Sequence, residues 1–133
     1  ICDPRDTYAD SEPVAGVNYS REMPDDAVRA LGEASRTAIV AVAHDPRQDD
    51  LALSAALDSR AFYIGALGSR RSAEARRARL ASLGYAARQL ARIHGPAGLD
   101  IGSKRPAEIA LSILAEVTAL RNGVTRQTES TVG

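Results

Sequence analysis

The sequence predicts an α/β fold with a doubly wound, mainly parallel sheet flanked by helices. Residues 37–43 and 61–64 are apolar runs with the length of short strands, and each is followed by a segment with helical patterning. The first run has no polar alternation, which is typical of a parallel strand buried on both faces. Alternating strands and helices of this kind form βαβ units, in which ligands bind outside the carboxyl ends of the strands.

Helix boundaries are predicted from caps and apolar spacing. The run Asp-Pro-Arg-Gln at residues 45–48 is a capping-box pattern, so a helix is expected to begin at Pro46 with Gln48 as the reciprocal partner of the cap. Pro106 begins the most strongly patterned helix, whose apolar residues recur every four positions and which is expected to end near Arg121. Further helices are expected over residues 25–34, 69–83 and 86–93, and a short strand at residues 17–19.

The first five residues are typical of the end of a strand and the loop that follows it. Ile1 and Cys2 form an apolar pair, and the acid and proline after them do not continue a strand. We therefore expect a Rossmann-like sheet that lacks its first strand and glycine turn, as part of a longer protein. Cys2 is expected to be a small buried residue of the opening strand. The domain is expected to cover residues 1–121, and the polar residues 122–133 to form a mobile tail.

The composition excludes several classes of protein. A chain of 133 residues with 44% hydrophobic and 26% charged residues is typical of one soluble globular domain. Seventeen basic and 17 acidic side chains cancel and only 4% of residues are aromatic, so no nucleic-acid partner is expected. A single cysteine excludes an intrachain disulfide and a multi-cysteine zinc site. No apolar run has the length of a bilayer span and no secretory signal is visible, so we expect a cytoplasmic protein without a membrane partner.

Charged residues follow the opening strand and the strand at residues 37–43. An acid such as Asp3 holds ribose hydroxyls in dinucleotide-binding folds, and an arginine such as Arg5 accepts a phosphate, but both residues also suit an ordinary Asp-Pro turn. His44 is a candidate for proton transfer or ligand contact at the same edge of the sheet. The neighbouring acids suit a helix cap and first turn, and His94 is too isolated to complete a metal site, so no metal is expected.

A glycine-containing turn at residues 65–72 is the more specific candidate. Gly65 and Gly68 allow close approach of the backbone to a ligand, and the helix start at Ser69 offers amides to an anion. Arg70 and Arg71 add charge and bidentate donors, so we favour a phosphate site here. The turn is not a P-loop, because no Gly-Lys-Ser/Thr follows the glycines. The alternative is a plain βα turn followed by a solvated arginine face that continues through Arg76, Arg77 and Arg79.

A second glycine-rich segment at residues 95–102 precedes the long helix. It contains Gly98, Asp100 and Gly102. Glycines and an acid in this position are consistent with a second loop that faces a phosphate or a pterin. They are equally consistent with a rigid turn that lets the helix pack across the sheet, and the spacing favours neither.

These segments together resemble the carboxyl-terminal Rossmann-like domain of the XdhC/CoxI family. The resemblance covers nearly all of residues 1–121, and its Gly-Ser-Arg-Arg and Gly-Leu-Asp-Ile-Gly segments are much more specific than a lone glycine motif. The segments that carry it are, in chain order, residues 3–5, residues 44–46 with Asp49, and residues 63–71, 94–102 and 106–110.

The resemblance implies an accessory factor for molybdenum hydroxylases such as xanthine dehydrogenase. It implies that the protein binds and protects the molybdenum cofactor (molybdopterin), supports its sulfuration and hands it to the apo-enzyme. The implied partners are that apo-enzyme, a sulfur-donating cysteine desulfurase and a second copy in a homodimer. The family's cysteine-bearing amino-terminal domain is absent from this sequence. The expected ligand-binding residues are Asp3, Arg5, His44, Gly65, Gly68, Ser69, Arg70, Arg71, Gly98, Asp100 and Gly102.

Two other functions remain open from the residues alone. In a fragment of an NAD(P)-dependent oxidoreductase, Asp3 would hold the ribose and His44 would act as the acid or base. In a pure interaction module, the arginine-rich helix would dock a partner. We expect a non-catalytic maturation factor ahead of both.

Overall fold

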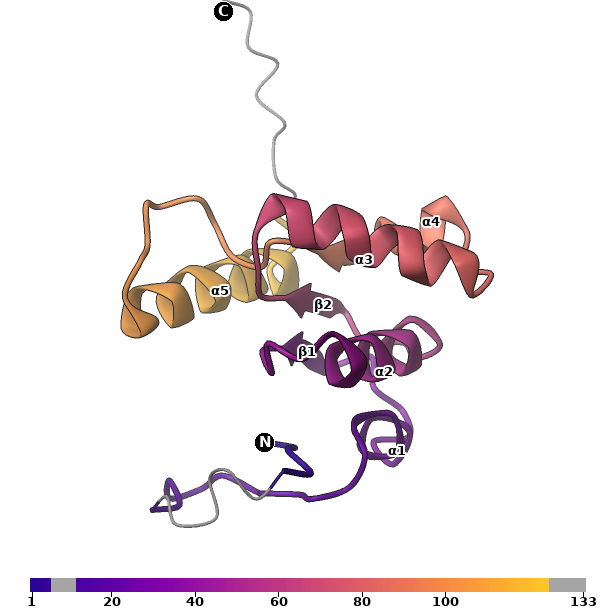
Figure 1. Cartoon of the computed structure of the whole chain (residues 1–133). Coiled ribbons are helices and arrows are strands. Elements are labelled where there is room, and N and C mark those ends of the chain that lie inside the picture. Colours follow the sequence, from indigo (N-terminus) through magenta and orange to yellow (C-terminus); the bar gives the residue numbers. More distant parts are fainter. Residues whose placement is uncertain (6–11, 125–133) are drawn as a thin grey trace, which may run out of the picture.

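The computed structural model describes residues 1–5 and 12–124 (Figure 1). The predicted α/β class is confirmed, because strands and helices alternate from β1 onward. Within the described residues, no helix is both long and apolar enough to cross a membrane. Most of the predicted tail, residues 125–133, lies outside the described residues. The elements are α1 (Pro24–Arg29), β1 (Ala38–Ala41), α2 (Pro46–Leu57), β2 (Tyr63–Ala66), α3 (Arg70–Ser82), α4 (Ala87–Leu90), β3 (Ile93–His94) and α5 (Pro106–Arg121).

Within residues 1–5 and 12–124, the sheet has three parallel strands in the order β1-β2-β3, as predicted for βαβ units. Ile64 in β2 pairs with Ile39 on one side and with Ile93 on the other. The sequence did not predict β3, because this strand has only two residues and the first of them, Ile93, falls within the segment that is expected to be helical. Gly65 lies inside β2 and does not end the strand, which runs on to Ala66.

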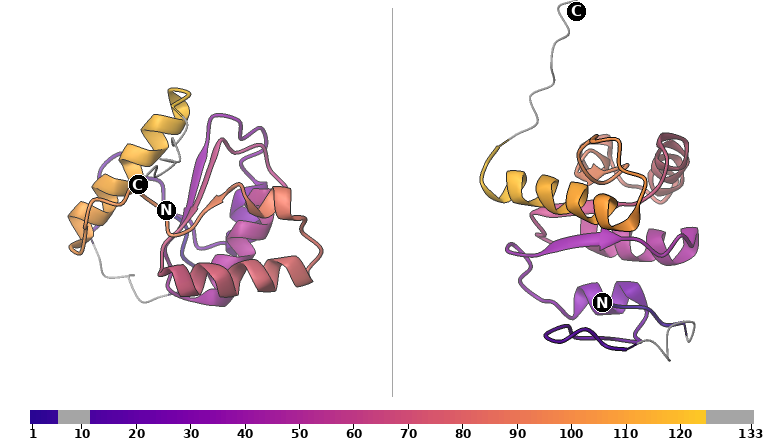
Figure 2. Two further views of the ribbon diagram at one scale, coloured as in Figure 1. Left: turned by 90° about the horizontal axis from the view of Figure 1, so that it is seen from above. Right: turned by 90° about the vertical axis from the view of Figure 1, so that its left-hand side faces the viewer.

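Helices cover both faces of the sheet (Figure 2). On one face, the aliphatic side chains of β1, β2 and β3 pack against α2 and α3 in a core that includes Ile39, Leu53, Ile64, Leu80 and Ile93. On the other face lies α5, which Tyr63 reaches with its hydroxyl group. All four residues of β2 are therefore buried. This is the pattern of a parallel strand between two helical layers.

The edge strand β1 is covered less completely than the sequence predicts. Ile39 and Ala41 are buried, but Ala38 and Val40 are only partly buried, so the expectation of burial on both faces is wrong for β1. Ala38 and Val40 line an open groove, and β1 pairs only with β2 among the described residues. A groove of about 450 Å³, lined by residues 1–4 and 37–43 among others, lies along β1.

The opening residues pair with Ser20 through one isolated parallel bridge, at Cys2. The predicted strand at residues 17–19 is therefore wrong, and the pairing falls one residue later and extends no further. Cys2 is exposed and donates its thiol hydrogen to the carbonyl of Glu22 at 3.2 Å, so its predicted burial is also wrong. Cys2 is exposed because a single bridge does not form a sheet on which other elements could pack and cover its side chain.

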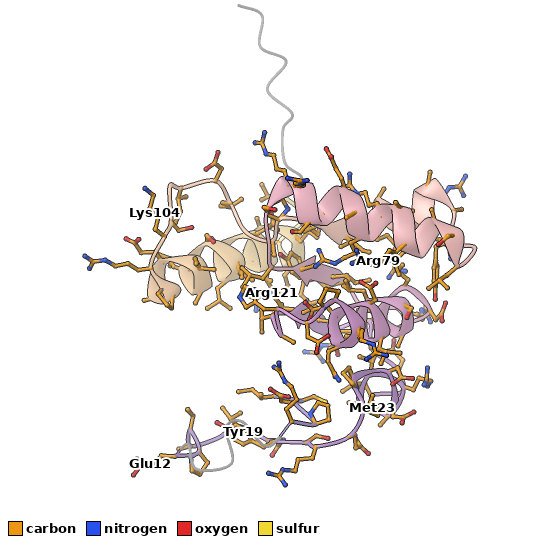
Figure 3. The ribbon with its side chains drawn as sticks, in the orientation of Figure 1. Glu12, Tyr19, Met23, Arg79, Lys104 and Arg121 are labelled. Carbon is orange, nitrogen blue, oxygen red and sulfur yellow. The ribbon has the colours of Figure 1, made fainter. Side chains whose placement is uncertain are left out.

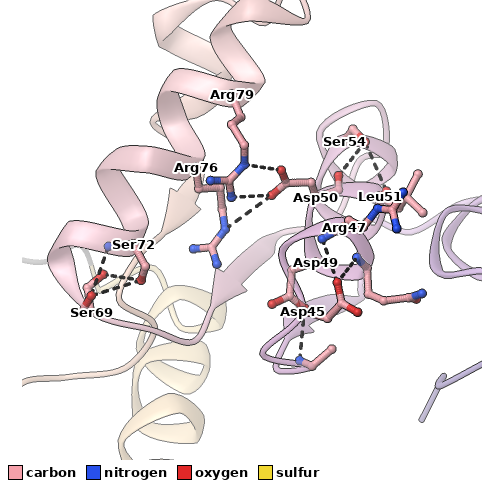
Figure 4. Close-up of polar contacts among 12 residues, drawn as sticks. Asp45, Arg47, Asp49, Asp50, Leu51, Ser54, Ser69, Ser72, Arg76 and Arg79 are labelled. Atoms are coloured by element: carbon pink, nitrogen blue, oxygen red, sulfur yellow. Dashed lines mark hydrogen bonds and ion pairs between the residues drawn. The ribbon is translucent and has the colours of Figure 1, made fainter. Parts of the chain in front are cut away.

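Local caps fix the start of α2 as predicted. The Asp45 carboxylate accepts hydrogen bonds from the backbone N–H groups of Arg47 at 3.0 Å and Gln48 at 3.4 Å (Figure 4). Figure 3 shows the described side chains on the whole ribbon. The reciprocal half of the capping box is not formed, because the buried Gln48 Oε1 has no partner. The long helix α5 begins at Pro106 and ends at Arg121, as predicted, whereas α1 and α4 are shorter than their predicted ranges.

Arginines of α3 tie this helix to α2. Arg79 donates two hydrogen bonds to the Asp50 carboxylate, at 2.7 and 3.2 Å, and Arg76 Nε lies 3.9 Å from the same group (Figure 4). Arg76 is only 6% exposed. The interpretation of residues 76–79 as a continuous solvated arginine face is therefore wrong at Arg76, which lies between the two helices.

A Gly65→Ala substitution tests the packing of β2 against α5. A Cβ atom at Gly65 would lie 2.7 Å from Cε1 of the buried Tyr63 ring, which must then move. We expect the free energy of unfolding to fall by about 1–3 kcal/mol, as for other overpacked cores, measured by urea denaturation. In a Tyr63→Leu background the same substitution should cost less. Equal losses in the two backgrounds would contradict the steric explanation.

The buried Asp49 carboxylate predicts a pH dependence of stability. Asp49 accepts the Ala43 N–H at 3.1 Å, but its burial raises the pKa of the carboxyl group above the ordinary value. A raised pKa in the folded state favours folding below the unfolded pKa, and this contribution is lost as pH rises through the folded pKa. Asp49→Asn keeps an acceptor oxygen, so the variant should be the more stable at neutral pH, and its advantage should vanish in acid.

Urea unfolding at neutral and acidic pH measures this difference. Asp45→Asn is the matched control, because asparagine caps a helix about as well as aspartate. A neutral-pH loss of stability in Asp49→Asn would show that the folded state favours the charged carboxylate.

Candidate functional site

A cavity of about 650 Å³ lies at the carboxyl ends of β2 and β3. Its walls are the start of α3, the loop at residues 95–103 and one side of α5. This is the edge at which ligands bind to parallel sheets, and the volume falls in the range of small-molecule sites. Five of the residues predicted from the sequence line it, namely Gly68, Arg70, Gly98, Asp100 and Gly102. We call it the β2–β3 cavity.

The wall from α3 presents a helix start to the β2–β3 cavity. Ser69 is the N-cap, and its hydroxyl oxygen accepts the Ser72 N–H at 3.1 Å. Gly68 has a φ of +143°, and a Cβ atom there would collide with the Ser72 hydroxyl. Ser69 therefore serves the cap and does not line the cavity, while Arg70, the first residue of α3, does. Arg71 is exposed and is not among the lining residues.

The loop wall is held against α5 by backbone contacts. The Leu99 N–H donates to the Ser112 carbonyl at 3.1 Å. A Cβ atom on Gly98 would lie 3.2 Å from the backbone nitrogen of Ile113, and the φ of Gly98 is +101°, so both space and conformation require glycine. The two sequence interpretations of this loop are thus compatible, since a rigid turn packed on α5 also forms one wall of the cavity.

A buried carboxylate lies among the lining residues, on α5. Glu116 is 4% exposed, and its Oε1 accepts the Tyr63 hydroxyl at 2.7 Å and the Gly98 N–H at 3.1 Å. His94 Nδ1 lies 3.4 Å from the same oxygen, and the His94 ring stacks on Tyr63 with centroids 4.7 Å apart. Burial, with the nearby Glu116, raises the pKa of the Tyr63 hydroxyl well above its ordinary value. We call these three side chains the Glu116 network.

Sequence reasoning missed the Glu116 network. His94 belongs to a segment that carries the family resemblance, but the sequence predicts no polar partner for it. Among the described residues, no three metal-binding side chains gather. The available signal was a single acid, Glu116, on the side of α5 that also carries the buried Ser112 and Ile113. A lone carboxylate on a buried helix face requires partners, and such a position is a candidate for a functional site.

Three of the other predicted residues, Asp3, Arg5 and His44, form a separate group at the end of β1. Asp3 and Arg5 pair with each other through two contacts, Oδ1–Nε at 2.9 Å and Oδ2–Nη2 at 3.0 Å, and these hydrogen bonds lower the pKa of Asp3. Arg5 Nη1 also reaches the Ala43 carbonyl at 3.5 Å. His44 follows, exposed and with a φ of 55°, a conformation uncommon outside glycine. Asp3, Arg5 and His44 do not line the β2–β3 cavity. The structure therefore divides the predicted site into two parts.

Comparison with known proteins places this geometry in a family. The model of the XdhC Rossmann domain matches residues 1–117. The chain is 35% identical over 85 residues to the molybdenum cofactor insertion chaperone PaoD of Escherichia coli K12, a match that covers 64% of this chain and 27% of PaoD. It is 37% identical over 75 residues to the uncharacterised protein YqeB of the same strain, over 56% of this chain and 14% of YqeB. The matches thus span only a minor part of either relative.

A solved structure supports the fold independently. The crystal structure of a xanthine dehydrogenase from Bacillus halodurans superposes with a TM-score of 0.64, at 24% identity, over 86% of this chain and 32% of that chain. At this identity the likeness concerns the fold. The family match, in contrast, extends over most of the sequence and includes both parts of the predicted site. The chain belongs to the XdhC Rossmann-domain family.

Proposed function

We propose that this domain binds the molybdenum cofactor as part of a maturation factor, which supports sulfuration of the cofactor and its insertion into a molybdenum hydroxylase such as xanthine dehydrogenase. Membership of the XdhC family and the similarity to PaoD, which is named as an insertion chaperone, support this function. The structural observation that carries it is the β2–β3 cavity, where a helix start and arginine side chains meet.

The phosphate group of the cofactor fits the α3 side of the β2–β3 cavity. Ser69 already accepts the N–H groups of Ser72, through its hydroxyl, and of Ala73, through its carbonyl. The amides of Arg70 and Arg71 are therefore the first-turn donors left for an anion. The side chains of Arg70 and Arg77 line the cavity, and neither forms an ion pair within the described residues. A phosphate would supply the missing partner.

The group at the end of β1 is proposed as a secondary contact. Both oxygens of Asp3 are held by Arg5, so a ribose would have to displace an existing charge pair. This weakens the alternative of an NAD(P)-dependent oxidoreductase, which needs a free acid at this point. His44 is exposed, so its ring is accessible to a ligand. The proposal extends to a homodimer and to contacts with the apo-enzyme and with a cysteine desulfurase, which rest on the family resemblance alone.

Arg70 and Arg71 form a matched pair for a binding experiment. Arg70→Ala should weaken binding of the molybdenum cofactor by the intact protein about 10- to 100-fold, because a charge-assisted hydrogen bond contributes about 1.5–3 kcal/mol. Arg71→Ala removes the same charge outside the cavity and should change affinity less. Fluorescence titration measures both affinities, with circular dichroism as the control for folding. Equal affinities for wild type and Arg70→Ala would remove the phosphate site.

His44→Gln distinguishes a carrier from an oxidoreductase. A carrier transfers no proton to its ligand, so the variant should retain most of its ability to activate a molybdenum hydroxylase. An oxidoreductase that used His44 as its acid or base would lose about 10²- to 10⁴-fold in turnover. The measurement is the activity of the matured hydroxylase, alongside nicotinamide-dependent turnover by the factor itself. Nicotinamide turnover that His44→Gln abolishes would overturn the carrier function.

A further inference from the structure

The Glu116 network holds one titratable nitrogen at the wall of the β2–β3 cavity. Both Glu116 and His94 line the cavity, and the His94 side chain is 28% exposed. Its Nδ1 faces Glu116 at 3.4 Å. Nε2 is therefore the ring nitrogen that remains for a ligand or solvent.

The His94 ring is positioned by buried neighbours. It stacks on Tyr63 at an interplanar angle of 13°, and Tyr63 is itself 1% exposed and donates to Glu116. The absence of a Cβ atom at Gly65 leaves the space that the Tyr63 ring occupies. These contacts fix the plane of the imidazole and direct one of its nitrogens to a carboxylate.

The protonation state of His94 determines the net charge that an anion meets in the β2–β3 cavity. Two arginines face three carboxylates, so the lining carries one net negative charge when His94 is neutral and none when His94 is protonated. An anion entering the cavity therefore favours the protonated ring. The charged and titratable groups that face His94 are Tyr63 from β2, Arg70, Glu74 and Arg77 from α3, Asp100 from the loop, and Glu116 from α5.

We propose that His94 is a proton-carrying ligand group of the β2–β3 cavity, so that an anionic ligand binds there together with a proton on His94. The inference rests on the proposed function for the identity of the anion, the phosphate of the molybdenum cofactor, but not for the coupling. The proton comes from solvent and adds to the ring nitrogen, and no covalent bond to the ligand forms or breaks. As pH rises and His94 loses this proton, the affinity of the cavity for the anion falls.

Isothermal titration calorimetry of the intact protein tests the coupling. The molybdenum cofactor and inorganic sulfate, whose charge is constant over this range, are titrated between about pH 6 and pH 8 in two buffers of different ionisation enthalpy. We expect proton uptake on binding and an affinity that falls by up to about tenfold per pH unit as the ring loses its proton. His94→Gln should abolish the proton uptake that accompanies sulfate binding and should flatten the pH dependence of the affinity.

A second variant distinguishes the effect of the Glu116 charge on His94 from a loss of folding. Glu116→Gln keeps an acceptor for the Tyr63 hydroxyl and the Gly98 N–H but removes the charge beside His94. The proton uptake that accompanies sulfate binding, measured by calorimetry in the same two buffers, should be smaller in this variant. Unchanged proton uptake would overturn the role of Glu116.

The outcomes for the coupling and for the proposed function differ. Cofactor binding with the same pH dependence in wild type and His94→Gln would overturn the coupling and leave the proposed function standing. His94-dependent proton uptake with sulfate, but no binding of the cofactor, would support the coupling and overturn the proposed function. Binding of neither ligand would overturn both.

Discussion

The packing of α5 on the sheet depends on one buried carboxylate. Glu116 Oε1 accepts a hydroxyl from β2 and an amide from the loop at residues 95–103, and it lies beside a ring from β3. A buried charge is costly unless such partners satisfy it. Removing any one of them would leave a less well solvated charge, so the strand, the loop and the helix are constrained together. The β2–β3 cavity is the space that these constrained elements enclose with α3.

Two glycines that were predicted to contact a ligand are in fact required by the packing around Glu116. Gly65 leaves room for the Tyr63 ring, and Gly98 lets the loop amide approach Glu116 and the α5 backbone. Gly102 differs, because its φ is +72° and a Cβ atom there would meet nothing within 4 Å. A glycine motif in sequence therefore combines positions fixed by packing with positions fixed by backbone conformation, and spacing alone does not separate them.

The sequence correctly predicted those features that are determined by residues close together in the chain. The cap at Asp45, the starts at Pro46 and Pro106 and the parallel arrangement follow from local chemistry and from the order of elements. The errors concern contacts distant in sequence. Exposure of Cys2 depends on what covers the strand, burial of Arg76 on the approach of α2, and the Glu116 network on three segments that meet only in the fold.

The distribution of paired charges favours the β2–β3 cavity over the end of β1 as the anion site. Asp3 and Arg5 neutralise each other, and Arg76 and Arg79 are engaged by Asp50. Arg70 and Arg77 have no such carboxylate partner within the described residues, and both line the cavity. An arginine without a carboxylate partner can still bind an anion. Leaving such an arginine unpaired costs the protein little stability as long as its side chain stays in contact with water. The protonation state of His94 then decides whether the cavity lining, including these two arginines, carries a net negative charge or none.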